Sequence, residues 1–269
     1  MGEQEVQYLA NALANNKTLI VLNWDHNYIR SAGAQYLAHA LTHNKTLTTL
    51  HLSANQLFPE AAQHLANALT KNYTLTALYL STNCIMDEGI KSLAAALMHN
   101  ETLTTLELGD NHIRSQGAQH LANALIKNET LINLNLYDNH IEDEGTECLT
   151  NALINSKKLT TLILDLNRIH NKGAQYLANL LMRNTSLTTL HIKHNSFDSN
   201  AAQYLANAWA KNKTLTTLKL GKNFIKVDGV KYLVNELKNN KTLTTLDLSF
   251  NHINPDGVEN LANGLKNNE

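Results

Sequence analysis

The sequence has little of what several large classes of protein depend on. Its 22 lysines and arginines are balanced by 23 aspartates and glutamates, for a formal net charge of −1. It therefore lacks the basic surplus that binding to a phosphate backbone requires. It has two cysteines, Cys84 and Cys148, which lie too far apart in the repeat pattern described below to form a disulfide, and two free thiols indicate a reducing compartment. We expect no nucleic-acid partner and a cytoplasmic location.

Signals for membranes and for catalysis are also lacking. The first six residues carry neither a basic region nor an apolar run, so we expect no signal peptide and no membrane association. No glycine-rich phosphate loop and no recurring set of acid, base and nucleophile is found. His191 and His194 are spaced like a pair of metal ligands, but no third ligand accompanies them. The sequence therefore predicts a protein that is not an enzyme, with no cofactor, no metal and no small-molecule substrate.

What the sequence does have is one motif, repeated along its whole length. The consensus L-x-x-L-x-L-x-x-N-x-I recurs with a period of 28 residues. Such regularity is typical of a solenoid, in which a repeat can bury its apolar face only against its neighbours. The opening leucines of the motif are Leu19, Leu47, Leu75, Leu103, Leu131, Leu159, Leu187, Leu215 and Leu243.

Each repeat divides into two halves. In the first half leucines alternate with polar residues, as in Leu47-Thr-Thr-Leu50-His-Leu52, which predicts a short strand that is buried on one side. In the second half small and apolar residues recur at helical spacing, which predicts a helix. We expect N-caps two residues before a recurring glycine, at Ser31, Asp87, Ser115, Asp143, Asn171 and Ser199. We expect left-handed turns to end the helices at Asn44, Asn72, Asn100, Asn128, Asn184, Asn212 and Asn240.

The unbroken period predicts one domain over residues 1–269. It begins with a helix at 3–15 and ends with a helix at 255–267, and its strands begin near residues 19, 47, 75, 103, 131, 159, 187, 215 and 243. Paired strands lie about 4.8 Å apart, whereas packed helices need about 8–10 Å between their axes. The predicted fold class is therefore α/β: a right-handed solenoid curved like a horseshoe, with a concave parallel sheet and convex helices.

An asparagine follows the strand in every repeat. Its amide is expected to turn inward and to bond the main-chain groups left over where the strand ends. Replacing Asn139 by alanine should then cost about 1–3 kcal/mol. This structural asparagine ladder comprises Asn27, Asn55, Asn83, Asn111, Asn139, Asn167, Asn195, Asn223 and Asn251.

These repeats resemble the leucine-rich repeat family over practically the whole chain, and their length and helical half resemble its ribonuclease-inhibitor-like subclass. The resemblance implies a horseshoe that binds another protein through its concave sheet and the loops at its rim. Few cysteines, a single type of repeat and near-neutral charge distinguish the chain from ribonuclease inhibitor itself. Near-identical repeats rich in Asn, Lys and Thr are similar to leucine-rich-repeat effectors of intracellular bacterial pathogens, which implies delivery by a specialised secretion system and a host-cell protein as partner.

Binding residues are expected where the repeats differ, because positions that stay the same serve stacking. The outward strand positions and the residue before the ladder asparagine vary most. Acidic and apolar residues fall in the middle of this strip and basic residues farther along, a mixture typical of binding hot spots. The predicted protein-binding residues are Tyr79, Glu107, Asp110, Tyr137, Asp138, Ile163, Asp165, Leu166, His191, Lys193, Lys219 and Lys222.

Two alternatives stay open from the sequence. The varied strip could consist of solvated surface residues that drifted after the repeats were duplicated. The chain could also be the substrate-recognition segment of a larger enzyme, such as a ubiquitin-ligase-type effector, with its catalytic domain outside these residues. The main hypothesis is a non-catalytic scaffold that binds a partner protein through its concave face.

Overall fold

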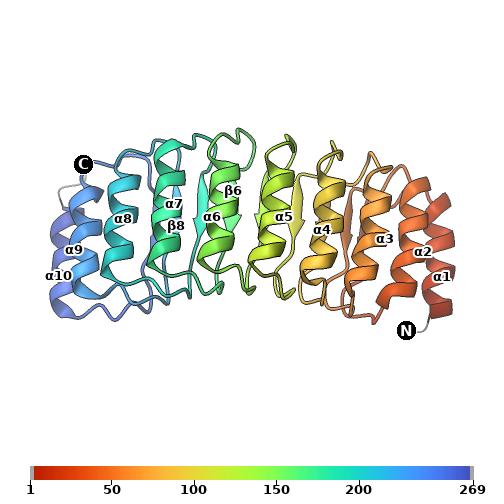
Figure 1. Ribbon diagram of the computed structural model, residues 1–269, viewed down its shortest axis with the longest axis horizontal. Coiled ribbons are helices and arrows are strands. Elements are labelled where there is room, and N and C mark those ends of the chain that lie inside the picture. Colours follow the sequence, from red (N-terminus) through yellow and green to blue (C-terminus); the bar gives the residue numbers. More distant parts are fainter. Residues whose placement is uncertain (1–2, 267–269) are drawn as a thin grey trace. The chain divides into compact units, whose positions relative to one another are not determined.

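The computed structural model describes residues 3–266 (Figure 1). The chain forms two compact units, Met1–Asn139 and His140–Glu269. In each unit short parallel strands pair in sequence order and alternate with helices along the chain, and the helices lie along one side of the sheet (Figure 1). This arrangement confirms the predicted α/β solenoid. The horseshoe curvature and the single domain over residues 1–269 stay predictions.

The first unit contains, within the described residues, five helices and five strands. The helices are α1 (Glu3–Asn15), α2 (Arg30–His43), α3 (Pro59–Leu69), α4 (Met86–Leu97) and α5 (Ser115–Leu125). The strands are β1 (Val21–Asn23), β2 (Thr49–His51), β3 (Ala77–Tyr79), β4 (Thr105–Glu107) and β5 (Asn133–Asn135).

The second unit contains five helices and four strands within its described part. The helices are α6 (Glu142–Leu153), α7 (Asn171–Arg183), α8 (Ser199–Trp209), α9 (Lys226–Leu237) and α10 (Pro255–Leu265). The strands are β6 (Thr161–Ile163), β7 (Thr189–His191), β8 (Thr217–Lys219) and β9 (Thr245–Asp247). Residue 267, where the last helix was expected to end, lies outside the described residues.

Each strand has three residues and begins two residues after the opening leucine of its repeat. The central leucine points into the core, and Leu106 is only 1% exposed. Main-chain pairing continues beyond the strands, because Ala54 N donates to Ser81 O at 2.9 Å and Thr82 N donates to Gly109 O at 2.8 Å. The loops that follow the strands are therefore held in the same register from repeat to repeat.

The asparagine that follows each strand joins neighbouring repeats. Asn139 is 1% exposed; its Nδ2 donates to Leu108 O at 3.0 Å, and its Oδ1 accepts from Asn111 N at 3.1 Å and from Ile113 N at 2.9 Å. The same amide bond to a carbonyl 31 residues earlier is made by Asn55, Asn83, Asn111, Asn195, Asn223 and Asn251. Asn27 and Asn167 donate within their own loops, to Asp25 O and Asp165 O.

A second asparagine ladder lies where the helices end, and it replaces the expected left-handed turns. That prediction was wrong, because Asn44 and Asn184 have φ of −69° and −73°. Instead, Asn72 Nδ2 donates to Leu41 O at 2.7 Å, and Asn72 Oδ1 accepts from Leu75 N at 2.7 Å. The last carbonyls of one helix are thus satisfied from the next repeat. Equivalent bonds are made by Asn44, Asn100, Asn128, Asn184, Asn212 and Asn240.

The residues expected to cap the N-termini of their own helices lie instead inside the first turns. Three of them accept hydrogen bonds from the start of the helix in the following repeat. Asp143 Oδ1 accepts from His170 N at 2.8 Å and from Gly173 N at 2.9 Å, and Asp87 makes the equivalent bonds to the start of α5. Asn171 Oδ1 accepts from Asp198 N at 3.3 Å in the same way. The predicted N-caps were therefore wrong, because the bonds go to the helix of the following repeat, 27–30 residues farther along the chain. The side chains that cap their own helices are Asp198 in α8 and Asn254 in α10.

The glycine near the start of most helices is required by packing. Glycines with positive φ are absent from the described residues, but a Cβ added at Gly257 would lie 2.6 Å from Ile253 Cγ2. The two repeats with alanine at this position have Leu57 and Phe197 four residues earlier, and these side chains have no methyl branch at Cβ. The β-branch and the added Cβ therefore compete for the same space.

Candidate protein-binding surface

The side chains on either side of each central leucine point away from the helices. We call the side chains directly after the central leucine, together with those two residues farther along, the strand face. Strand-face side chains are mostly half-buried, because they alternate with leucines that face the core. In the first unit they are Asn23, His51, Tyr79, Glu107, Asn135, Asp25, Ser53, Ser81, Gly109 and Tyr137. In the second unit they are Ile163, His191, Lys219, Asp247, Asp165, Lys193, Gly221 and Ser249.

The loop residue before each ladder asparagine has a left-handed main chain, with φ between 50° and 59° in every repeat. For residues other than glycine this conformation costs about 1–2 kcal/mol, so the surrounding hydrogen bonds must hold it. The ladder asparagines provide those bonds, as where Asn27 N donates to Asn55 Oδ1 at 2.9 Å. The side chains of these residues are therefore fixed in direction: His26, Ala54, Thr82, Asp110, Asp138, Leu166, His194, Lys222 and Phe250. We call them the rim, together with the side chains directly after the ladder asparagines, which are Tyr28, Gln56, Cys84, His112, His140, Arg168, Ser196, Phe224 and His252.

The strand face of the first unit combines aromatic rings with one half-buried acid. The rings of His51 and Tyr79 are stacked, with centroids 4.0 Å apart and planes 9° apart. Asn135 Nδ2 donates to Glu107 Oε2. Burial raises the pKa of Glu107 above its ordinary 4.5, and the bond from Asn135 offsets part of that rise. Tyr137 is 41% exposed and is the most accessible ring in this group.

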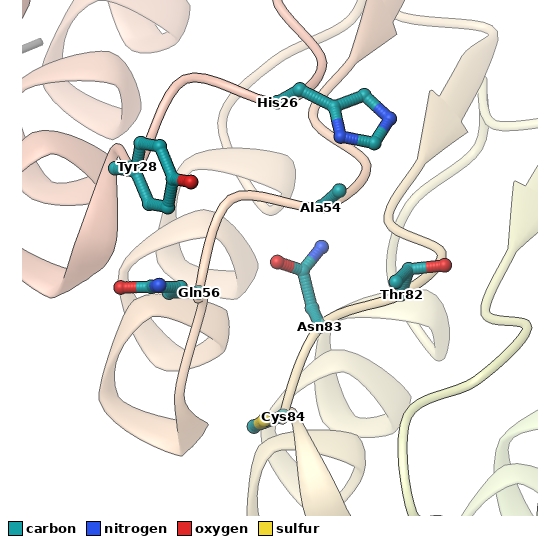
Figure 2. A pocket seen from close by; sticks show the side chains of 7 residues that line it. All are labelled: His26, Tyr28, Ala54, Gln56, Thr82, Asn83 and Cys84. Carbon is teal, nitrogen blue, oxygen red and sulfur yellow. The ribbon is translucent and has the colours of Figure 1, made fainter.

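The loops of the first unit enclose a shallow depression of about 260 Å³ (Figure 2). Its lining comes from three consecutive repeats: His26, Tyr28, Ala54, Gln56, Thr82, Asn83 and Cys84. Tyr28 is 56% exposed, and its φ of 55° turns it outward. Tyr28 was not among the predicted binding residues, which were drawn from the outward strand positions and the residue before the ladder asparagine.

The strand face of the second unit carries a charged network. Lys193 Nζ forms an ion pair with Asp247 Oδ2 at 3.3 Å, which spans the intervening strand β8. Gly221 leaves room for this pair, because a Cβ there would lie 3.2 Å from Asp247 Oδ1. Burial alone would raise the pKa of Asp247, but the bonds from Ser249 and the pair with Lys193 lower it overall.

Two further groups in this network have shifted pKa values. Asp165 Oδ1 accepts from Lys193 N at 2.6 Å, but burial dominates and raises the pKa of Asp165. Burial, followed by repulsion from Lys219 and Lys193, lowers the pKa of His191 from 6.5 to about 4. His191 is therefore a neutral ring near pH 7, and the positive charge of the strand face in the second unit comes from the two lysines.

The structure divides the predicted binding residues between the two units. The first unit holds Tyr79, Glu107, Asp110, Tyr137 and Asp138, and the second holds Ile163, Asp165, Leu166, His191, Lys193, Lys219 and Lys222. All of them lie on the strand face or the rim. Ile163 and Leu166 are half-buried and are less accessible than the sequence suggested. Whether any of these residues binds a partner stays a prediction.

The rim of the second unit contains exposed aromatic residues that were not among the predicted binding residues. Phe224 and Phe250 are 50% and 77% exposed. Phe224 stacks on His252, with centroids 5.8 Å apart and planes 8° apart, and Lys222 Nζ lies 5.8 Å from the centroid of the Phe250 ring. The sequence did contain a signal for these two residues, namely an aromatic residue at a rim position that is polar in most other repeats.

Two other features are absent from the described residues, a metal site and a membrane-spanning helix. No group of three or more His, Cys, Asp or Glu side chains in residues 3–266 is arranged to hold a metal ion. Among the described helices, none has the length and apolar character needed to cross a membrane.

Two units of stacked strand–loop–helix repeats, fixed by asparagine ladders, define the class of repeat solenoids that present a strand face. A family model described as "Leucine Rich repeat" matches the sequence at residues 43–66, 71–94, 99–122, 127–149, 155–178, 183–206, 211–234 and 239–262. The chain belongs to the leucine-rich repeat family. Proteins of this family generally act as protein-binding scaffolds.

Two of the solved structures that resemble part of this chain are as follows. "Leiomodin-1 Actin-Binding Site 2" is 20% identical with a TM-score of 0.49, and the match covers 57% of this chain and 88% of that one. The tropomodulin C-terminal domain of Caenorhabditis elegans is 18% identical with a TM-score of 0.47, and the match covers 56% and 92%. No curated protein sequence matches this one.

Proposed function

We propose that this protein is a non-catalytic scaffold that binds a partner protein through its strand face and rim. The observation that carries this proposal is the difference between the buried positions of the repeats and the positions whose side chains point outward. Buried leucines and asparagines repeat almost without change, whereas the side chains they hold outward differ from repeat to repeat. A varied surface on a constant frame is suited to recognition.

The two units offer different chemistry to a partner. The first unit presents Tyr79, Tyr137 and the rim acids Asp110 and Asp138, and the second presents lysines beside exposed phenyl rings. Aromatic side chains supply contact area at little entropic cost, and charges select the partner and steer association. A protein with matching acidic, basic and apolar groups is the kind of partner that such a surface fits.

The finer expectations from the sequence remain proposals. We propose that the protein works in a reducing cytoplasm, including that of a host cell into which it is delivered, and that its partner is then a host protein. Support comes from the free thiols of Cys84 and Cys148 and from the resemblance to ribonuclease-inhibitor-like repeats and bacterial effectors. The enzyme alternative, a substrate-recognition segment, would use the same surface and is separated from the scaffold by an activity assay on the captured partner.

Site-specific photocrosslinking tests the proposed surface. A benzophenone amino acid is placed at His51 or His191 on the strand face, and at the exposed helix positions Asn67 or Asn123 as matched controls. After irradiation in cell lysate, the strand-face variants should crosslink one discrete protein that the helix variants do not. Equal crosslinking from both sides, or crosslinking from the helices alone, would overturn the proposal.

A further inference from the structure

The rim of the second unit carries an aromatic cluster that repeat packing does not require. Phe250 is 77% exposed and Phe224 is 50% exposed, although burying a phenyl ring is favourable by about 1.5–3 kcal/mol. The rim position of Phe250 holds Ala54 and Thr82 in the first unit, so an aromatic ring is not needed to form the loop. These two rings are therefore available to contact another molecule.

The loops around the rings are hollowed. Two depressions, each of about 450 Å³, share the stacked pair of Phe224 and His252 in their linings. One of them is also lined by Phe250, His194 and Lys222. Each depression is wide enough to accept one large apolar side chain while keeping it in contact with a phenyl ring.

The charge around the cluster is positive. Lys222 and Lys226 are exposed, and among the described residues neither forms an ion pair. Asp247 is already paired with Lys193, and Asp228 is paired with a lysine of its own helix. The uncompensated lysines should attract carboxylates and raise the rate of association with an acidic segment.

We infer that the second unit binds an acidic segment of the partner protein. One apolar side chain of that segment contacts Phe224 and Phe250, and flanking carboxylates meet Lys222 and Lys226. This inference rests on the proposed function and assigns the chemistry of one part of the same surface. Single-stranded nucleic acid, whose bases can also stack on aromatic rings beside lysines, is the competing ligand that the test must separate.

Fluorescence anisotropy with labelled probes tests the inference on the full chain. The probes are an acidic peptide with one central phenylalanine, the same peptide with alanine at the centre, a basic peptide with the central phenylalanine, and oligo(dT). The acidic phenylalanine peptide should bind about tenfold more tightly than either control peptide and than oligo(dT). Equal affinity for the basic peptide, tighter binding of oligo(dT), or no saturable binding below about 1 mM would overturn the inference.

Paired substitutions identify the site. F224A/F250A should reduce affinity for the acidic phenylalanine peptide to the level of the alanine peptide, while Y28A at the rim of the first unit should leave it unchanged. K222E/K226E should reverse the preference toward the basic peptide. K211E/K213E makes the same change of charge in the loop that follows α8 and should have no such effect. Similar loss in both lysine variants would show that net charge alone attracts the peptide.

Failure of this inference can be distinguished from failure of the proposed function. If the peptides fail to bind but crosslinking still maps a partner to the strand face, the scaffold proposal stands and the acidic-segment assignment falls. If peptides bind at Phe224 and Phe250 but no protein crosslinks to the strand face, the rim alone is the binding site.

Discussion

Replacing Asn139 by alanine is the sharpest test of how the repeats are held together. The substitution removes an amide that bonds three main-chain groups of the preceding repeat, namely Leu108 O, Asn111 N and Ile113 N. Because Asn139 is 1% exposed, water cannot reach these groups without opening the loop. All three are left without their partner in the variant.

The expected loss follows from those three groups. Each buried main-chain group without a partner costs about 1–3 kcal/mol. At the low end of this range, the three groups together lower the free energy of unfolding by about 3 kcal/mol. In a protein of this size about 1 kcal/mol lowers Tm by about 3 °C, and we expect a fall of about 9 °C. Asn123→Ala is the control, because its exposed side chain lies within α5, where alanine favours the helix.

The two tryptophans make the measurement specific to each unit. Trp24 lies in the first unit with Asn139, and Trp209 lies in the second; both are buried. Urea unfolding of Asn139→Ala is followed by fluorescence in a W209F background, which reports the first unit, and in a W24F background, which reports the second. Units that unfold separately would show the shift only through Trp24, whereas a single domain over residues 1–269 would show the same shift through both.

Unchanged unfolding in Asn139→Ala would refute the reasoning, since it would mean that the amide bonds add nothing beyond what solvent supplies. A loss of equal size in Asn123→Ala would refute it as well. In that case the effect would belong to asparagine in general and not to the ladder.

Three further predictions concern packing, capping and pH. Gly257→Ala should lower the free energy of unfolding by about 1–2 kcal/mol, because the new methyl meets Ile253 Cγ2; adding Ile253→Leu should restore it in urea titrations, and a double variant without recovery contradicts the steric explanation. Ser156→Asn should add about 1 kcal/mol, because Ser156 Oγ is 3.5 Å from its two loop amides whereas Asn184 Oδ1 lies 2.7 and 2.9 Å from the equivalent pair; an unchanged Tm would count against it. Asp165→Asn should stabilise the protein near neutral pH, because burial raises the pKa of Asp165 above 3.8 and the folded state disfavours its ionised form. In thermal melts the gain should vanish below pH 3.8, where the carboxyl is protonated in both the folded and the unfolded states. A gain that does not depend on pH would be the contrary result.

The arrangement of strands and helices could be predicted from the sequence because it depends on periodicity, and alternating leucines and helical spacing survive in every repeat. The ends of the helices could not. Rules for capping residues assume a partner in the same helix, but Asp143 bonds His170 N and Asn72 bonds Leu41 O, both in neighbouring repeats. Only stacking brings these groups together, and single-helix rules contain no information about stacking.

The candidate surface was predicted in part. The varied columns lie on the strand face and rim as expected, but Glu107 and Asp165, selected as binding acids, also bond Asn135 and Lys193 N. Tyr28 was missed because its exposure depends on a left-handed main chain, which the sequence of the loop does not reveal. Side-chain variety can be read from sequence, whereas the direction of a loop side chain depends on its neighbours.

Hydrogen exchange on the complex with the captured partner tests the central claim most directly. The account predicts slower exchange in the loops that follow the strands, where the rim residues lie, and unchanged exchange along the exposed sides of α2–α5 and α7–α9. Protection confined to the helices, with the rim loops exchanging as in the free protein, would contradict it.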